Sequence, residues 1–166
     1  MISAVVYNSL TGSCEKYAQL ISAALHVPAI PMGGHVRSGG KVIYIGWARA
    51  GSIYGYDKAA KNYDIAAAVL VSMSPAGEKN IEAARKAGNI PQEVKVFNVQ
   101  GAFHMKKLPA PYRLVMKLIN KQIEKRISSL PSPSEAELAT LRMAQSGEGE
   151  PAQWNIDDIV AWAKQD

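Results

Sequence analysis

The sequence predicts an α/β fold built on a largely parallel sheet. Over residues 1–100, apolar runs of strand length alternate with amphipathic segments of helix length, which is the pattern of an open sheet with helices packed on it. Because the carboxyl ends of parallel strands meet at one edge of such a sheet, we expect the turns that follow the strands to form the binding site. These turns are rich in small residues and comprise Ser9–Cys14, Trp47–Gly55, Ser74–Gly77 and Gln100–Phe103.

The first strand, turn and helix are the clearest part of this pattern. Ile2–Tyr7 is an apolar run, and the helix after the turn carries one apolar face, made of Tyr17, Leu20, Ile21, Ala24 and Leu25. The first amides of a helix have no partner within it, and the helix dipole favours negative charge there. Ser9, Thr11 and Ser13 add hydroxyl donors, so we expect the turn to hold a phosphate.

The next segments are shorter or interrupted. His26–Pro31 contains two prolines, which exclude a central strand and allow a short edge strand. Met32–Gly40 holds four glycines and is predicted to be a loop. Asp57 is the expected N-cap of a short helix, and a helix over Glu78–Lys86 is expected to end at Gly88. The further strands are expected at Lys41–Gly46, Ala66–Met73 and Glu93–Val99.

The last third of the chain is predicted to be helical. Pro111–Ile127 has one apolar side at helical spacing, made of Leu114, Val115, Leu118, Ile119, Ile123 and Ile127. A basic stripe at four-residue spacing accompanies it and comprises Arg113, Lys117, Lys121 and Lys125. Ser134–Glu137 is a capping box that starts a helix ending at Ala144. Gly147–Pro151 is expected to be a linker, and Asn155 is expected to cap the terminal helix.

Length and composition fit a single domain spanning residues 1–166, in which residues 101–150 form a helical insertion before the C-terminal helix. The chain is 48% hydrophobic and 20% charged, which is typical of a globular protein. Its one cysteine, Cys14, excludes an internal disulfide and a cysteine-based zinc site. No signal peptide is apparent and no apolar run reaches the length of a membrane span, so we expect a cytoplasmic protein.

The residues alone limit the ligand of the first turn. The pattern Gly-x-x-x-x-Gly-Lys-Ser/Thr of nucleotide triphosphate sites is absent, and no Gly-x-Gly-x-x-Gly follows a strand. A hydroxyl-rich loop without lysine suits one phosphate monoester. In the alternative interpretation, Thr11 and Ser13 only cap the helix. Cys14 either has a pKa lowered by the helix N-terminus or is a small packing group. No metal cluster or hydrolytic triad is apparent, and no catalytic residue is assigned.

The turn after the first strand resembles the phosphate loop of the flavodoxin family. The resemblance rests on Ser9-Leu10-Thr11-Gly12-Ser13-Cys14, in which Cys14 stands where the family usually has threonine. The loop also occupies the family's position, directly after strand one.

Later segments are similar to a subgroup of that family, the flavodoxin-type, menaquinone-dependent protoporphyrinogen dehydrogenases. Ile45-Gly46 followed by Ala50–Gly55 is similar to the subgroup's loop after strand three. Gln100–Phe103 and Pro111–Ile119 are similar to its segment after strand five, which simple flavodoxins lack. Gln153-Trp154, which leads into the final helix, fits as well. The resemblance covers most of the chain and leaves residues 128–151 unmatched.

The resemblance implies a flavodoxin-like three-layer fold, with five parallel strands in the order 2-1-3-4-5, helices on both faces and an extra helical segment after strand five. It also implies one noncovalently bound FMN. By position, the phosphate would be surrounded by Ser9, Thr11, Gly12, Ser13 and Cys14. The isoalloxazine ring would be framed by Ala48, Arg49, Ala50, Gly51, Ser52 and Tyr54, together with Ser74, Pro75, Ala76 and Gly77. Trp47, Tyr54 and Tyr56 are candidates for stacking on the ring, with packing in the core as the alternative.

The implied function is that of an FMN-dependent oxidoreductase. It would pass electrons from an organic substrate, with a porphyrinogen as one candidate, to a quinone or a protein acceptor. Two other interpretations stay open: a noncatalytic electron-transfer flavodoxin, and a flavodoxin-fold binding domain that has lost FMN.

The charge of the chain bears on its partners. The formal net charge is +5 and the isoelectric point is near 9.3, which favours acidic partners. Three interpretations of the basic helix Pro111–Ile127 stay open: a solvated surface helix, a peripheral contact with an anionic membrane, and a docking site for an acidic protein. We expect a small-molecule or quinone electron partner and no nucleic acid; the oligomeric state is left open.

Overall fold

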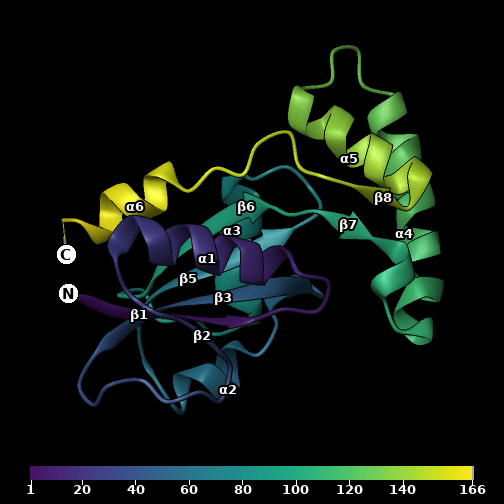
Figure 1. Cartoon of the computed structure of the whole chain (residues 1–166). Coiled ribbons are helices and arrows are strands. Elements are labelled where there is room, and N and C mark those ends of the chain that lie inside the picture. The colour runs from purple at the N-terminus through teal and green to yellow at the C-terminus, as the bar shows by residue number, and fades with distance from the viewer. Residues whose placement is uncertain (166) are drawn as a thin grey trace.

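A mostly parallel sheet with helices on both faces forms the centre of the molecule (Figure 1), as seen in a computed structural model that describes residues 1–165. The parallel strands are β1 (Ile2–Asn8), β2 (Ala29–Pro31), β3 (Lys41–Arg49), β5 (Asp64–Ser72) and β6 (Lys95–Gln100). They lie in the order β2-β1-β3-β5-β6, and β4 (Ser52–Ile53) pairs antiparallel with the end of β3. The predicted α/β class with a largely parallel sheet is confirmed. Asp166, the last residue of the predicted domain, lies outside the described residues.

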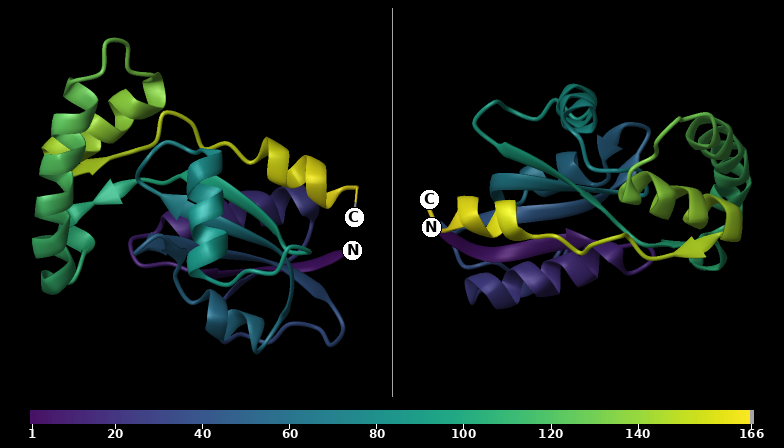
Figure 2. Two further views of the ribbon diagram at one scale, coloured as in Figure 1. Left: turned by 180° about the vertical axis from the view of Figure 1, so that it is seen from behind. Right: turned by 90° about the horizontal axis from the view of Figure 1, so that it is seen from above.

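Two pairs of helices cover the two faces of the sheet (Figure 2). One apolar core joins the sheet to α1 (Ser13–Leu25) and α6 (Asp157–Ala163), and the other joins it to α2 (Tyr56–Ala60) and α3 (Glu78–Ala87). Neighbouring strand residues point to opposite faces, so Val5 belongs to the first core and Val6 to the second. Both side chains are fully buried, and each such side chain stabilises the fold by about 1.5–3 kcal/mol.

After β6 the chain leaves the sheet and forms a helical insertion beyond the carboxyl ends of the strands (Figure 1). It comprises β7 (Phe103–His104), the 3-10 turn η1 (Met105–Lys107), α4 (Ala110–Ser128), α5 (Glu135–Ser146) and β8 (Glu148–Gly149). The predicted capping box is confirmed: Ser134 Oγ accepts from the Glu137 amide, and the Glu137 carboxylate accepts from the Ser134 amide. The prediction of a plain linker over Gly147–Pro151 is wrong, because β8 pairs antiparallel with β7 and closes the insertion.

Three local predictions differ from the structure. The N-cap of α2 is Gly55 rather than Asp57, since the helix already begins at Tyr56, whose ring is buried. The N-cap of α6 is Ile156, although Asn155 Oδ1 accepts from the Asp157 amide at 2.9 Å. The segment after Gly46, predicted to be a loop, continues β3 and turns back into β4.

The apolar side predicted for the basic helix is divided between two faces of α4. Ile127 is buried, and Asn120, about two turns earlier on the same face, donates to the Ala144 carbonyl of α5. Leu114 and Leu118, in contrast, are 67% and 63% exposed. Successive residues turn by about 100° around a helix, so the residues that contact α5 and the exposed leucines lie on different faces. The prediction that the six apolar residues form one side of the helix is therefore wrong.

Candidate functional site

An apolar cavity lies where the carboxyl ends of the strands meet the helical insertion. It encloses about 140 Å³ and is open to solvent on one side. The loop after β1 contributes Ser9, Leu10, Thr11, Ser13 and Cys14 to its lining. The strand ends contribute Trp47, Ala48, Val71, Ser72 and Met73, and the chain after β6 contributes Gly101, Ala102, Phe103, Leu108, Tyr112 and Met116. Three of the four predicted turns thus reach one cavity.

The loop after β1 leaves the first turn of α1 without a side-chain cap. Gly12, the N-cap residue, has a φ of 106°, which only glycine adopts readily. Its amide donates to Ser9 Oγ at 3.1 Å, and its carbonyl accepts from the Lys16 amide. No side chain caps the helix, so the interpretation in which Thr11 and Ser13 only cap it is wrong. The Thr11 hydroxyl has no hydrogen-bond partner among the described residues.

A close contact joins this loop to the chain after β6. Ser13 Oγ donates to the Ala102 carbonyl at 3.2 Å. A Cβ atom at Gly101 would lie 2.6 Å from Val71 Cγ1 and 3.1 Å from Ser13 Cβ, which is closer than side chains approach. Glycine at position 101 therefore allows the start of the insertion to lie directly against the loop.

Cys14 is a packing residue rather than a reactive thiol. Its side chain is 2% exposed and belongs to the core beneath α1. Burial disfavours the thiolate and raises the pKa of Cys14 to about 12. The interpretation with a lowered pKa is therefore wrong, because loss of hydration outweighs the helix N-terminus at this depth.

Two aromatic residues of the cavity lining, Trp47 and Tyr112, form an aromatic group with Tyr54, which lies outside the lining. The Trp47 and Tyr54 rings stack with centroids 4.4 Å apart, and Tyr112 meets Trp47 edge-on at 5.9 Å. The Arg49 guanidinium lies 5.3 Å from the Tyr54 ring centroid and 6.0 Å from that of Tyr112, so a positive charge lies beside the aromatic group. The Trp47 indole N–H is buried without an acceptor. Tyr56, another stacking candidate, is 4% exposed and packs in the core.

The predicted site residues divide into three groups. The first lines the cavity and comprises Ser9, Thr11, Ser13, Cys14 and Ala48, with Gly12 in the same loop. The second lies in the β3–β4 hairpin outside the lining and comprises Arg49, Ala50, Gly51, Ser52 and Tyr54. The third lies in the turn after β5, also outside it, and comprises Ser74, Pro75, Ala76 and Gly77. Ser72 and Met73, just before that turn, line the cavity instead.

Sequence reasoning did not place the insertion's side chains in the site. Leu108, Tyr112 and Met116 all line the cavity. Tyr112 and Met116 are four residues apart on α4, which places them on one face of the helix, whereas Leu108 precedes the helix in extended backbone. That spacing is the signal that identifies them, although it does not reveal which part of the protein the face contacts.

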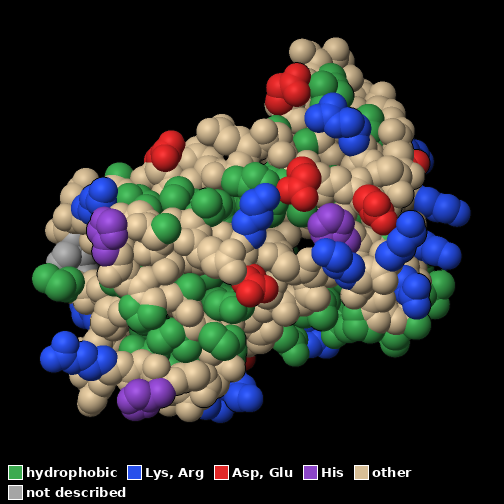
Figure 3. Space-filling view, viewed as in Figure 1, with side chains coloured by type: hydrophobic (Ala, Val, Ile, Leu, Met, Phe, Trp, Pro, Cys, Tyr) green, Lys and Arg blue, Asp and Glu red, His purple; other side chains and the backbone are tan. Residues whose placement is uncertain are grey.

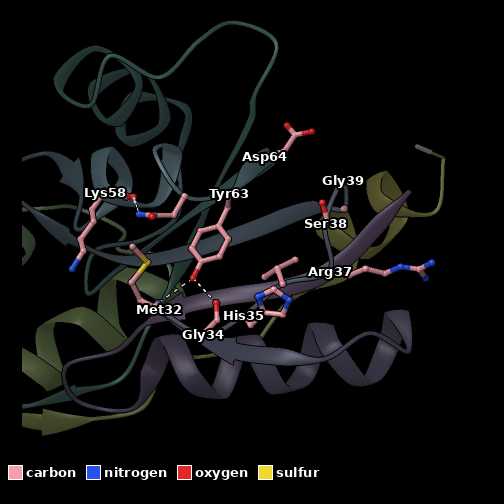
Figure 4. A pocket seen from close by; sticks show the side chains of 13 residues that line it. Met32, Gly34, His35, Arg37, Ser38, Gly39, Lys58, Tyr63 and Asp64 are labelled. Carbon is pink, nitrogen blue, oxygen red and sulfur yellow. Dashed lines mark hydrogen bonds between the residues drawn. The ribbon is translucent and has the colours of Figure 1, made fainter.

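A larger hollow of about 600 Å³ lies between the loop Met32–Gly40 and the segment Lys58–Asp64 (Figure 4). The Tyr63 hydroxyl at its centre accepts from the Gly33 amide and donates to the Gly34 carbonyl, so it is already paired. Figure 4 shows Lys58 and Asp64 pointing in different directions. Because its charged side chains do not converge, we place the candidate site at the carboxyl edge.

Within residues 1–165, no group of three or more His, Cys, Asp or Glu side chains is arranged to hold a metal ion. Comparison of the chain with models of known protein families finds no match, and comparisons with curated proteins and with solved structures find none either.

Proposed function

We propose that this chain is an FMN-binding, flavodoxin-like oxidoreductase that passes electrons from an organic substrate to a quinone or protein acceptor. One observation carries the proposal. The apolar, aromatic-lined cavity is continuous with a helix N-terminus that has no side-chain cap and carries a free hydroxyl at Thr11. The apolar lining suits a planar apolar ring, and the uncapped helix N-terminus suits a phosphate.

The topology supports the same assignment. The parallel strands lie in the order β2-β1-β3-β5-β6, which is the order that the flavodoxin family implies. In doubly wound sheets of this order the ligand binds at the switch point between β1 and β3. The cavity is lined on one side by the loop after β1 and on the other by Trp47 and Ala48 of β3.

At the phosphate end, the groups present suit a monoester dianion. The first amide of α1 that donates within the helix is that of Lys16, whose acceptor is the Gly12 carbonyl. The amides between Gly12 and Lys16 therefore have no acceptor within the helix and are available as donors. Thr11 adds a hydroxyl, and Ser9 retains its own hydroxyl proton while it accepts from Gly12. Cys14 adds no hydroxyl, so the amides and Thr11 carry the phosphate contacts.

At the ring end, the protein offers an apolar wall and one polar donor. Tyr112 and Met116 of the insertion close the cavity against Trp47 and limit the entry of water. A carbonyl oxygen of a bound ring would supply the acceptor that the Trp47 indole N–H lacks. FMN itself supplies the hydride and one-electron chemistry.

The charge beside the cavity favours an acidic substrate. Arg49 lies against the aromatic group, next to the Tyr54 and Tyr112 rings. Cations next to an apolar cavity suit an organic molecule that carries carboxylates. A porphyrinogen belongs to this class and is the substrate that we propose to test first.

The test uses ligand pairs that differ only in the phosphate. We expect the apoprotein to bind FMN more tightly than riboflavin, measured by quenching of flavin fluorescence. Thr11→Ala removes a hydrogen bond to a charged group, so FMN affinity should fall about 10- to 100-fold, with riboflavin affinity and the urea midpoint little changed. Ser38→Ala, an exposed hydroxyl in the loop Met32–Gly40, is the control and should change neither affinity.

The outcomes separate the competing functions. Equal affinity for FMN and riboflavin, or equal losses of affinity and folding stability in Thr11→Ala, would contradict the phosphate site. A chain that binds neither flavin would be a binding domain without FMN. If FMN binds, porphyrinogen oxidation with menaquinone as acceptor is expected; reduction and reoxidation of the flavin without turnover would instead identify an electron carrier.

A further inference from the structure

One face of α4 is apolar and has no partner in the described chain. It is made of Leu114, Val115, Leu118 and Ile119, which are 67%, 53%, 63% and 39% exposed, and we call it the solvent face. These residues lie within two turns of the helix and form a continuous strip. Isolated exposed leucines are common on protein surfaces, but a contiguous strip on one helix marks an interaction surface.

A row of cations lies alongside the solvent face. Arg113, Lys117, Lys121 and Lys125 are four residues apart, and Lys106 and Lys107 lie just before the helix. Glu124 is the one acidic residue of α4. Figure 3 shows lysine and arginine side chains gathered over α4, with apolar surface next to them. The helix therefore presents apolar and cationic surface together.

We propose that the solvent face of α4 binds the surface of an anionic lipid bilayer. The apolar side chains of the solvent face would lie at the boundary between headgroups and acyl chains, and the row of cations would contact lipid phosphates. No helix in the described part of the chain is long and apolar enough to cross a membrane. The contact is therefore one with the surface.

The shape and charge of α4 favour a bilayer over a second copy of this chain. A symmetric contact between two copies would place two α4 helices together. The cation rows of the two copies would then face each other and repel, since Glu124 is the one acidic residue on each helix that could balance them. The helix stands out from the body of the molecule (Figure 2). A fluid, planar, anionic surface accommodates such a convex element without a preformed groove.

The position of α4 gives the contact a consequence for the candidate site. Tyr112 and Met116, on a neighbouring face of the same helix, line the apolar cavity, and Leu10 of the loop after β1 is partly exposed there. Binding through the solvent face would bring the cavity close to the lipid, from which an apolar molecule can enter. The bilayer contact itself does not depend on FMN.

The experiment measures sedimentation of the apoprotein with vesicles, so a failure of FMN binding does not affect it. We expect the protein to sediment with phosphatidylcholine vesicles that contain phosphatidylglycerol, less at higher salt, and not with phosphatidylcholine alone. Lys117→Gln and Lys121→Gln should each weaken binding about fivefold. The control pair is Lys58→Gln and Lys61→Gln near α2, which should leave binding unchanged.

Apolar variants complete the test. Leu114→Ser with Leu118→Ser should abolish sedimentation with anionic vesicles without lowering stability, because both side chains are exposed. Leu20→Ser on α1 is the matched control. The proposal is overturned if the wild type does not bind anionic vesicles, or if the α4 variants bind as it does. It is also overturned if sedimentation equilibrium shows a dimer that the two serine substitutions dissociate.

Discussion

Gln100 Nε2 donates a hydrogen bond of 2.7 Å to Thr140 Oγ1 and so joins the end of β6 to the middle of α5. Both residues are buried, at 7% and 0% exposure. Each also donates to the Met73 carbonyl, Gln100 at 2.9 Å and Thr140 at 3.0 Å. Since Met73 lines the cavity, this network fixes the insertion against the cavity wall.

The first prediction follows from this network. Thr140→Val keeps the shape of the side chain but removes its donor and leaves the Gln100 amide with fewer acceptors. We expect the free energy of unfolding to fall by about 1–3 kcal/mol, measured by urea denaturation. Thr140→Ser keeps the hydroxyl and should lose clearly less. Equal losses in both variants would mean that the methyl group, and not the hydrogen bond, stabilises this contact.

The second prediction concerns the backbone of the phosphate loop. Gly12 has a φ of 106°, and a Cβ atom there would meet no atom within 4 Å. Gly12→Ala therefore introduces backbone strain alone, and we expect a loss of about 1–2 kcal/mol in thermal or urea denaturation. Gly77→Ala is the matched control, since Gly77 has a φ of −177° and also has open space. A loss in Gly77→Ala as large as that in Gly12→Ala would contradict the strain argument.

The third prediction concerns stability in alkali. Burial raises the pKa of Cys14 from its ordinary value of 9.0 to about 12, and it raises the pKa values of Tyr17 and Tyr44 as well. Between the unfolded and folded pKa values the native state binds more protons than the unfolded state, so stability falls as pH rises. Each such group should cost about 1.4 kcal/mol per pH unit, beginning near pH 9 for Cys14 and near pH 10 for Tyr17 and Tyr44.

Urea denaturation between pH 7 and pH 11 measures this loss. The stability contributed by these groups should be fully present below pH 9. Cys14→Ala removes the first group, so its stability should decline less steeply above pH 9 than that of the wild type. Identical slopes for the two proteins would show that Cys14 does not hold its proton more tightly in the folded state.

Local patterns predict much of the sheet. The apolar runs locate β1, β3, β5 and β6, the two prolines of His26–Pro31 correctly limit β2 to a short edge strand, and Gly88 ends α3 as expected. The turns after β1 and β6 reach one cavity because the carboxyl ends of parallel strands lie at one edge of the sheet. These features depend on periodicity and on residues close in the chain.

The features that sequence reasoning missed depend on distant contacts or unusual backbone. The hairpin after β3 turns at Ala50 and Gly51 with positive φ values, a conformation that alanine rarely adopts and that the sequence therefore does not predict. Helical spacing finds the apolar residues of α4 but does not assign faces to them. Those faces depend on distant contacts: Gln100 and Thr140, residues 40 apart in the chain, join α5 to the end of β6, and α4 in turn packs on α5 through Asn120.

The flavin content of the purified protein is the most direct test of FMN binding. We expect a yellow protein with the absorption bands of oxidised flavin, which releases FMN in a one-to-one ratio to the chain on heat denaturation. FMN added to the apoprotein should restore the spectrum. A colourless protein that takes up no added FMN would contradict the proposed FMN site.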